Sequence, residues 1–168
     1  GWSEQNTETG FSAYQNGQYV IQVNTPSYDL WGSYDAQQFG DVIVNVDVNV
    51  LQSANGTGGY GVMCRYVDND NYYKLEVDED GYFIIYKYLG GEYIALYDWD
   101  NRSSLIGQTY AHLTVSCIGN QLTLAVNDAV IASVTDNSLS QGYIGLAAGV
   151  FDDPGIQVGF DNLTVHAP

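Results

Sequence analysis

Positively charged side chains are scarce in this 168-residue sequence. It contains four, Arg65, Lys74, Lys87 and Arg102, against 20 Asp and Glu, and its formal net charge is −16 at pH 7. Binding to nucleic acid or to an anionic membrane surface requires clustered Lys and Arg, so this composition disfavours both partners. No stretch approaches the roughly 20 apolar residues of a membrane-spanning helix, and two cysteines cannot build a four-cysteine zinc site. These absences favour neutral or cationic partners and an extracellular or cell-surface location.

Tyrosine and glycine are abundant, with 15 and 19 residues, and the apolar residues recur with a period of two. The clearest example runs from Val42 to Val50, where every second residue is valine, as in a half-buried strand. Further strands are expected at 19–23, 60–67, 72–77, 82–89, 92–99, 113–117, 122–126, 130–134, 143–148 and 158–165. Turn pairs such as Asp80-Gly81 and Asn127-Asp128 separate them. We therefore expect one all-β domain over 1–168, an antiparallel sandwich of two sheets, with an irregular N-terminal segment at 1–17.

Nine of the fifteen tyrosines lie between Tyr60 and Tyr97. Alternation places Tyr86 and Tyr88 on one face of a strand, and Tyr97 and Trp99 on one face of the next strand. Aromatic rings stack on the C–H-rich faces of sugars, so an exposed face of this kind would bind carbohydrate. The alternative is structural, because tyrosine favours strands and cross-strand aromatic pairs stabilise sheets.

Three segments together resemble a known family. They are GVMCRYVDNDNYYKLEVDEDGYFIIYKYLGGEY, LTVSCIGNQLTLAVNDAVIASV and GYIGLAAGVFDDPGIQVGFDNLTV. They look like bacterial concanavalin A-like jelly-roll domains, similar to laminin-G-like modules, family 66 carbohydrate-binding modules and 3-keto-disaccharide hydrolase-like domains. The resemblance covers residues 14–165 and implies a two-sheet jelly roll. It leaves the function open, because this fold hosts lectins, hydrolases and spacers.

One departure from these relatives concerns the edge of a sheet. Relatives usually begin with a short strand before the segment that matches Gly1-Trp2, and that strand is absent here. Its absence would leave an open edge that can accept a strand from another chain. The second hypothesis is therefore a self-assembling surface or filament subunit, a homo-oligomer joined through this edge, although a net charge of −16 opposes contact between copies.

Three alternating acids, Glu76, Asp78 and Asp80, suggest a third hypothesis. Laminarinase-type glucanases of the same broad fold carry Glu-x-Asp-x-Glu on one strand, and retaining glycosidases place two carboxyl groups about 5–5.5 Å apart. Here the third acid is Asp, and Asp80-Gly81 is also a predicted turn. A glycoside hydrolase that uses Glu76 and Asp78 is therefore the weakest of the three hypotheses.

The sequence also contains candidate ligands for a metal ion and a candidate disulfide. Asp68 and Asp70 form an acidic turn, and calcium takes six to eight oxygen ligands from such loops. Related jelly-roll modules often place a structural calcium ligand at the position of Asp161, which makes calcium the one cofactor that the sequence suggests. Cys64 and Cys117 both lie in expected strands and are candidates for a disulfide, which an extracellular location favours.

These observations favour a non-catalytic, extracellular carbohydrate-binding module whose partner is a polysaccharide or another glycan. In this interpretation aromatic rings form a stacking platform, and Arg65 and Glu76 hold the sugar hydroxyls. The candidate binding residues are Arg65, Tyr73, Glu76, Tyr86, Tyr88, Tyr97 and Trp99.

Overall fold

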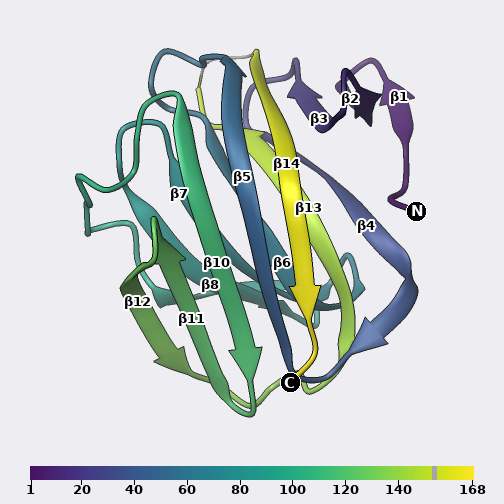
Figure 1. Ribbon diagram of the computed structural model, residues 1–168, viewed down its shortest axis with the longest axis vertical. Coiled ribbons are helices and arrows are strands. Elements are labelled where there is room, and N and C mark those ends of the chain that lie inside the picture. The colour runs from purple at the N-terminus through teal and green to yellow at the C-terminus, as the bar shows by residue number, and fades with distance from the viewer. Residues whose placement is uncertain (153–154) are drawn as a thin grey trace.

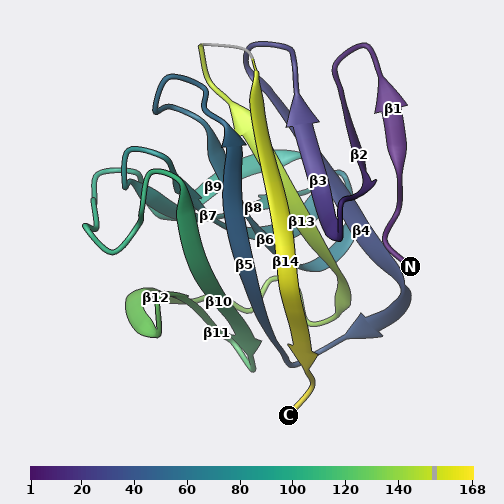
Figure 2. The same ribbon diagram turned by 45° about the horizontal axis from the view of Figure 1, so that its top comes forward.

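Two antiparallel sheets lie face to face in this protein (Figure 1 and Figure 2). The computed structural model describes residues 1–152 and 155–168, and nothing in these residues is a helix long and apolar enough to cross a membrane. The eight-stranded sheet contains, in spatial order, β1 (Gln5–Thr7), β2 (Gly10–Gln15), β3 (Gln18–Val23), β14 (Ile156–His166), β5 (Val42–Gln52), β10 (Tyr110–Ile118), β11 (Gln121–Val126) and β12 (Ala129–Thr135). The six-stranded sheet contains β4 (Tyr28–Phe39), β13 (Gly142–Val150), β6 (Gly59–Asp68), β7 (Asn71–Asp78), β8 (Phe83–Leu89) and β9 (Glu92–Tyr97). The predicted all-β, two-sheet antiparallel jelly-roll sandwich is confirmed.

The main core lies between the two sheets. The inward valines of β5, namely Val42, Val44, Val46 and Val48, are fully buried there, as their alternation predicted. They share one apolar cluster with inward residues of the six-stranded sheet such as Leu75 and Ile85. Each fully buried side chain of this size contributes roughly 1.5–3 kcal/mol relative to an exposed one. The sequence pattern of β5 therefore follows directly from its position between core and solvent.

A second apolar cluster covers the outer face of the six-stranded sheet. It is formed by Met63, Tyr72, Ile84, Tyr86 and Ala147, with Trp31, Tyr66, Tyr88 and Trp99 packed against it. The central strands of this sheet are therefore buried on both faces, which explains why segments such as Phe83–Tyr86 are apolar at consecutive positions. This outer face carries the candidate functional site.

The N-terminal segment corrects one expectation. Residues 1–17 are not irregular, because they contain β1 and β2, and β2 pairs with β3 over its whole length. The turn between β2 and β3 is Asn16-Gly17, and both residues have positive φ, 51° and 81°. Asn-Gly is a strong hairpin signal. The weak alternation of β2, in which Ser12 rather than an apolar residue is fully buried, obscured this strand.

β4 is a further strand that the apolar pattern did not reveal. It is an edge strand of the six-stranded sheet and mixes Asp, Ser and Gln with a few buried residues. Trp2 forms an antiparallel bridge with Tyr34 on β4, and the Ser3 N–H donates to the Ser33 carbonyl over 2.9 Å. The first residues of the chain therefore contact β4 before the chain continues as β1 in the other sheet.

Candidate functional site

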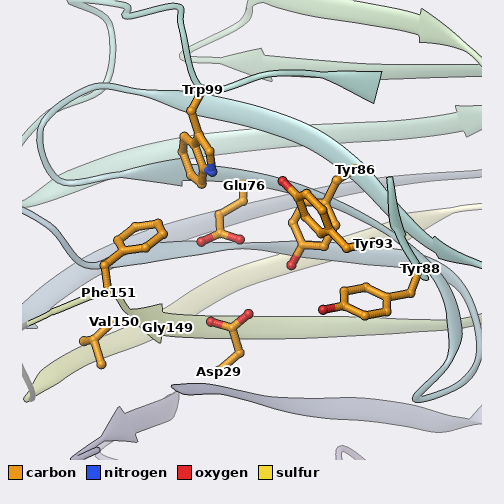
Figure 3. A pocket seen from close by; sticks show the side chains of 9 residues that line it. All are labelled: Asp29, Glu76, Tyr86, Tyr88, Tyr93, Trp99, Gly149, Val150 and Phe151. Carbon is orange, nitrogen blue, oxygen red and sulfur yellow. The ribbon is translucent and has the colours of Figure 1, made fainter. Parts of the chain in front are cut away.

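A cavity of about 230 Å³ opens on the outer face of the six-stranded sheet (Figure 3). Its lining comes from five strands, β4, β7, β8, β9 and the end of β13, and from the segments that follow β9 and β13. The lining residues are Asp29, Glu76, Tyr86, Tyr88, Tyr93, Trp99, Gly149, Val150 and Phe151. Two carboxylates and five aromatic rings thus surround one space, which combines aromatic walls with a few polar groups as small-ligand sites do.

The two carboxylates of the cavity share one buried ammonium group. Lys74 Nζ lies 2.9 Å from Glu76 Oε2 and 3.1 Å from Asp29 Oδ2. The side chains of Lys74 and Glu76 are almost completely buried, whereas that of Asp29 is 43% exposed. Lys74 itself does not line the cavity, so the charged groups that face a ligand are both carboxylates.

Burial and mutual attraction shift the pKa values of this group. Burial raises the pKa of Glu76 to about 7, although the ammonium of Lys74 opposes this shift. Burial would lower the pKa of Lys74, but the carboxylates of Asp29 and Glu76 outweigh it and hold the pKa well above its usual value. Lys74 is therefore charged throughout the physiological range, while Glu76 changes its charge near neutral pH.

Two glycines make room for these carboxylates. Asp29 of β4 is paired with Gly149 of β13, and Gly149 is paired with Gly59 of β6. A Cβ atom at Gly149 would lie 1.7 Å from Asp29 Oδ1, and one at Gly59 would lie 2.1 Å from Glu76 Oε1. Any side chain at either position would displace a carboxylate. The glycines within these strands therefore mark a place where side chains from other strands lie over the backbone.

The aromatic rings stand in two groups on either side of the carboxylates (Figure 3). Tyr86, Tyr88 and Tyr93 form one group, with ring centroids 5.0–6.2 Å apart. Trp99 and Phe151 form the other, an edge-to-face pair 5.8 Å apart. Tyr93 and Phe151 are 47% and 44% exposed. Exposed aromatic rings of this size are available to stack on a ligand.

Four of the predicted binding residues lie together in this cavity, namely Glu76, Tyr86, Tyr88 and Trp99. Tyr97 does not join them. The pairing of β8 with β9 is irregular between Ile85/Tyr97 and Tyr86/Ala95, so one extra residue of β9 turns Tyr97 to the core side. There its ring stacks on Phe83 with centroids 5.6 Å apart.

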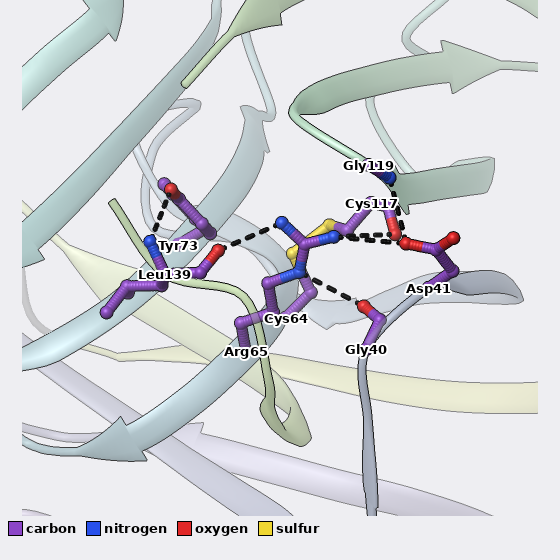
Figure 4. Close-up of polar contacts among 8 residues, drawn as sticks. All are labelled: Gly40, Asp41, Cys64, Arg65, Tyr73, Cys117, Gly119 and Leu139. Atoms are coloured by element: carbon purple, nitrogen blue, oxygen red, sulfur yellow. Dashed lines mark hydrogen bonds and ion pairs between the residues drawn. A yellow bond between two sulfur atoms is a disulfide. The ribbon is translucent and has the colours of Figure 1, made fainter. Parts of the chain in front are cut away.

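Arg65 and Tyr73 also lie away from the cavity (Figure 4). The Arg65 side chain is 2% exposed and donates to the carbonyls of Gly40, Leu139 and Cys117, as well as to Asp41. The hydroxyl of Tyr73, on the core side of β7, accepts from the Leu139 N–H and donates to Asp136. These side chains hold loops at the end of the sandwich, so their polar groups are engaged within the protein.

Cys64 of β6 and Cys117 of β10 form a disulfide next to Arg65 (Figure 4). The bond connects the six-stranded sheet to the eight-stranded sheet across the core, and both cysteines are fully buried. It therefore fastens the two layers at the same end of the sandwich as the Arg65 hydrogen bonds.

The three alternating acids do not form one carboxylate row. Glu76 lines the cavity, whereas Asp78 Oδ1 accepts hydrogen bonds from the backbone N–H groups of Asp80 and Tyr82 over 3.0 and 2.9 Å. Asp80 is exposed in the turn and pairs with Arg102 at 2.7 Å. The strand ends at Asp78, so the third acid belongs to the turn, and Asp78 stabilises that turn rather than lining the cavity.

The acids proposed as calcium ligands are distributed over both sheets. Asp68 Oδ1 accepts hydrogen bonds from the Asp70 backbone and the Asn71 side chain, which closes a turn after β6. Asp161 lies on β14 of the other sheet, beside Asp47. Within residues 1–152 and 155–168, no three His, Cys, Asp or Glu side chains converge as metal ligands would. Calcium binding therefore stays a prediction.

Sequence reasoning missed Asp29 and Phe151 as members of the cavity. Both come from parts of the chain far from β7 and β8, and β13 lies between Asp29 and the strands of the tyrosines. Gly59 and Gly149 were the available signal, since glycine inside a strand often marks a close approach of other groups.

The comparisons with known proteins concern the fold. No protein-family model and no curated protein matches the sequence. The carbohydrate-binding module CBM66 from Bacillus subtilis is similar in structure, with a TM-score of 0.67 and 20% identity over 99% of this chain and 96% of that chain. A Bacillus subtilis protein of unknown function with a galectin-like fold gives 0.66 and 12% identity over 98% and 88%. A β-glucanase from Bacillus licheniformis gives 0.62 and 10% identity over 99% and 92%. The chain therefore has the concanavalin A-like jelly-roll fold that its resemblance implied.

Proposed function

We propose that this protein is an extracellular, non-catalytic glycan-binding module and that the cavity around Glu76 is its binding site. The observation that supports this function most strongly is the pairing of exposed rings with fixed polar groups in one cavity. Tyr93, Trp99 and Phe151 offer ring faces to a sugar, and the carboxylates of Asp29 and Glu76 accept hydrogen bonds from its hydroxyl groups. CBM66, a carbohydrate-binding module of the same fold, agrees with this proposal.

The geometry favours binding over hydrolysis. A retaining glycosidase needs two carboxyl groups that flank the scissile bond and are free to exchange a proton or attack carbon. Here Asp78 is engaged in its turn, and the carboxylates of Asp29 and Glu76 are both tied to Lys74. A module with this arrangement would hold a glycan without cleaving it, and measurement of reducing ends after incubation with any glycan that binds would reveal a hydrolase.

Replacing Tyr93 by alanine is expected to weaken glycan binding by up to about tenfold, because the variant loses an exposed stacking ring of the cavity. The measurement is a broad glycan array, followed by calorimetric titration of the best ligand. Tyr110→Ala is the matched control, since Tyr110 is similarly exposed, at 43%, but lies on the eight-stranded sheet. Equal affinities of the two variants, or an array without any bound glycan, would contradict the proposed function.

A second candidate function, assembly of copies into a surface filament, is favoured by an apolar groove at one side of the sandwich. The groove has a volume of about 300 Å³ and lies between β4 of one sheet and the last residues of β14 of the other. It is lined by Trp2, Tyr34, Gln37, Phe39, Ile144, Leu163 and Val165. Trp2 and Ser3 contact part of the edge strand β4, whereas β3 pairs with β14 only over Ile156–Phe160 and ends before the last residues of β14. A strand of a second copy could therefore pair with a backbone edge and fill the groove with alternate apolar side chains.

Assembly of this kind predicts concentration-dependent oligomers that one charge in the groove abolishes. Val165→Asp is expected to give only monomers, because a strand that fills the groove would bury an unpaired carboxylate. Val130→Asp, at an exposed position on β12, is the control. Light scattering and electron microscopy at high salt, which screens the net charge of −16, provide the measurement. A wild-type protein that stays monomeric under these conditions would eliminate the second candidate.

A further inference from the structure

Each Lys and Arg of the protein is engaged in an ion pair. Arg65 contacts Asp41, Lys87 contacts Asp136, Arg102 contacts Asp80, and Lys74 contacts both Asp29 and Glu76. The remaining acids are not balanced by cationic side chains, and the net charge is −16. An approaching ligand therefore meets a negative potential, which attracts cations and repels anions.

The cavity is negatively charged, like the protein as a whole. Its charged lining residues are Asp29 and Glu76, and Lys74, the cationic side chain that pairs with them among the described residues, lies buried beneath them. Glu76 changes its charge near pH 7, and with Glu76 ionised two carboxylates and one ammonium leave one uncompensated negative charge. A bound cation favours this ionised form, because a nearby positive charge lowers the pKa of a carboxyl group. One positive charge on a ligand would bring the sum to zero, whereas a ligand carboxylate or sulfate would face two carboxylates directly.

The aromatic walls suit a cation equally well. An ammonium group near the face of Trp or Tyr is attracted by the ring quadrupole, and this attraction increases when the group is partly desolvated. Tyr86, Tyr93 and Trp99 stand around the carboxylates (Figure 3), and Tyr86 already has Lys74 Nζ 5.7 Å from its ring centroid. A sugar that carries a protonated amine would use the rings and the carboxylates at the same time.

We propose that the cavity selects amino sugars with a free, protonated amine over neutral sugars and against acidic sugars. This inference rests on the proposed function, since it names the class of glycan that the cavity binds. The sugar ring would stack on the exposed aromatic side chains, and its ammonium group would lie between Asp29 and Glu76. The exposed carboxylate of Asp29 would be the main partner of the ammonium, because Glu76 is bound more closely to Lys74.

Three β-1,4-linked tetrasaccharides that differ only at carbon 2 test this selection. Cellotetraose carries a hydroxyl group there, the chitin tetramer an acetamide, and the fully deacetylated chitosan tetramer an ammonium. Tetragalacturonate serves as the acidic probe. Calorimetric titration at about pH 6, where the amines of the chitosan tetramer are mostly protonated, is expected to show this tetramer bound about tenfold more tightly than cellotetraose, with no binding of tetragalacturonate.

Substitution of Asp29 separates a specific contact from general attraction to an acidic protein. Asp29→Asn is expected to reduce the ratio of chitosan to cellotetraose affinity to about twofold or less. Asp128→Asn removes the same charge from an exposed turn of the other sheet and should leave the ratio unchanged. Circular dichroism shows whether each variant is folded.

The outcomes distinguish this inference from the proposed function. Equal or tighter binding of cellotetraose or the chitin tetramer would overturn the selection for amines and leave the glycan-binding function in place. A ratio that falls equally in Asp29→Asn and Asp128→Asn would also overturn it, because the preference would then be a property of the whole surface. If none of the tetrasaccharides binds, the inference fails, and the glycan array decides separately whether the proposed function stands.

Discussion

Replacing Lys74 by methionine is expected to lower the free energy of unfolding by about 3 kcal/mol at pH 8, because removal of one partner leaves a buried charge uncompensated. Lys74 is 2% exposed, and the carboxylate of Glu76 beside it is 6% exposed. Methionine preserves most of the side-chain volume, so the loss would come from Glu76 rather than from a cavity. Urea denaturation of the wild type and the variant measures this difference in the free energy of unfolding.

The loss of stability caused by Lys74→Met should be smaller at pH 5 than at pH 8. In the folded protein the pKa of Glu76 is already raised to about 7, mainly by burial, so the folded state favours the protonated carboxyl group. A raised carboxyl pKa means that stability decreases as pH rises from the unfolded value toward the folded one. Without Lys74 the pKa of Glu76 would rise further. At pH 5 the carboxyl group is then neutral and its burial costs less.

Two further variants test this explanation. Glu76→Gln added to Lys74→Met should recover part of the stability at pH 8, because no buried charge remains. Arg102→Met is the control for an exposed ion pair: Arg102 and Asp80 are 58% and 51% exposed, and we expect a change of about 1 kcal/mol or less. A Lys74→Met variant that is as stable as the wild type at both pH values would show that the pair is not needed for the fold.

Removal of the Cys64–Cys117 disulfide is expected to cost about 4 kcal/mol, since the bond closes a loop with a sequence separation of 53 and restricts the unfolded chain. For a protein of this size the melting temperature should fall by about 10 °C. The double variant Cys64→Ala/Cys117→Ala, compared with the wild type in urea denaturation, provides the measurement. The dependence of the free energy on urea concentration should also increase, because the unfolded chain becomes less compact.

Reduced wild-type protein is the control that separates the crosslink from packing. It keeps both sulfur atoms in the core but lacks the bond between them. Similar losses in the reduced protein and in the double alanine variant would assign the effect to the crosslink. A loss in the alanine variant alone would assign it to the missing sulfur atoms, and the prediction would then be wrong.

Alternation of apolar residues and turn-forming residues are local signals that depend on only a few neighbouring positions. The sequence alone was therefore sufficient to predict the strands that show these signals clearly. The valines of β5 and the Asn127-Asp128 turn between β11 and β12 appear in the structure as their pattern predicted. The same local logic placed Glu76, Tyr86 and Tyr88 on one face, because β7 and β8 are paired strands joined by a short turn. Three of the nine residues that line the cavity therefore followed from period-two alternation in one hairpin.

Irregularities in strand pairing, such as an extra residue in one strand, could not be predicted from alternation. One extra residue in β9 reverses the side to which Tyr97 points, and no composition signal distinguishes that strand from a regular one. Arg65 has a positive φ of 50° next to a break in the pairing of β6 with β7, and its side chain is buried among carbonyl groups instead of facing a ligand.

What the sequence by itself determined is the set of strands with clear alternation, the class of the fold and the negative charge that any ligand meets. Only the tertiary structure decided that Asp29 and Phe151 join Glu76 in one cavity. The order β4-β13-β6-β7 brings together segments that lie far apart in the chain, and the glycines of β13 and β6 allow the two carboxylates to approach one lysine. The physical reason is that alternation is set by a residue's immediate neighbours, whereas strand order depends on how the whole chain buries its apolar surface between two sheets.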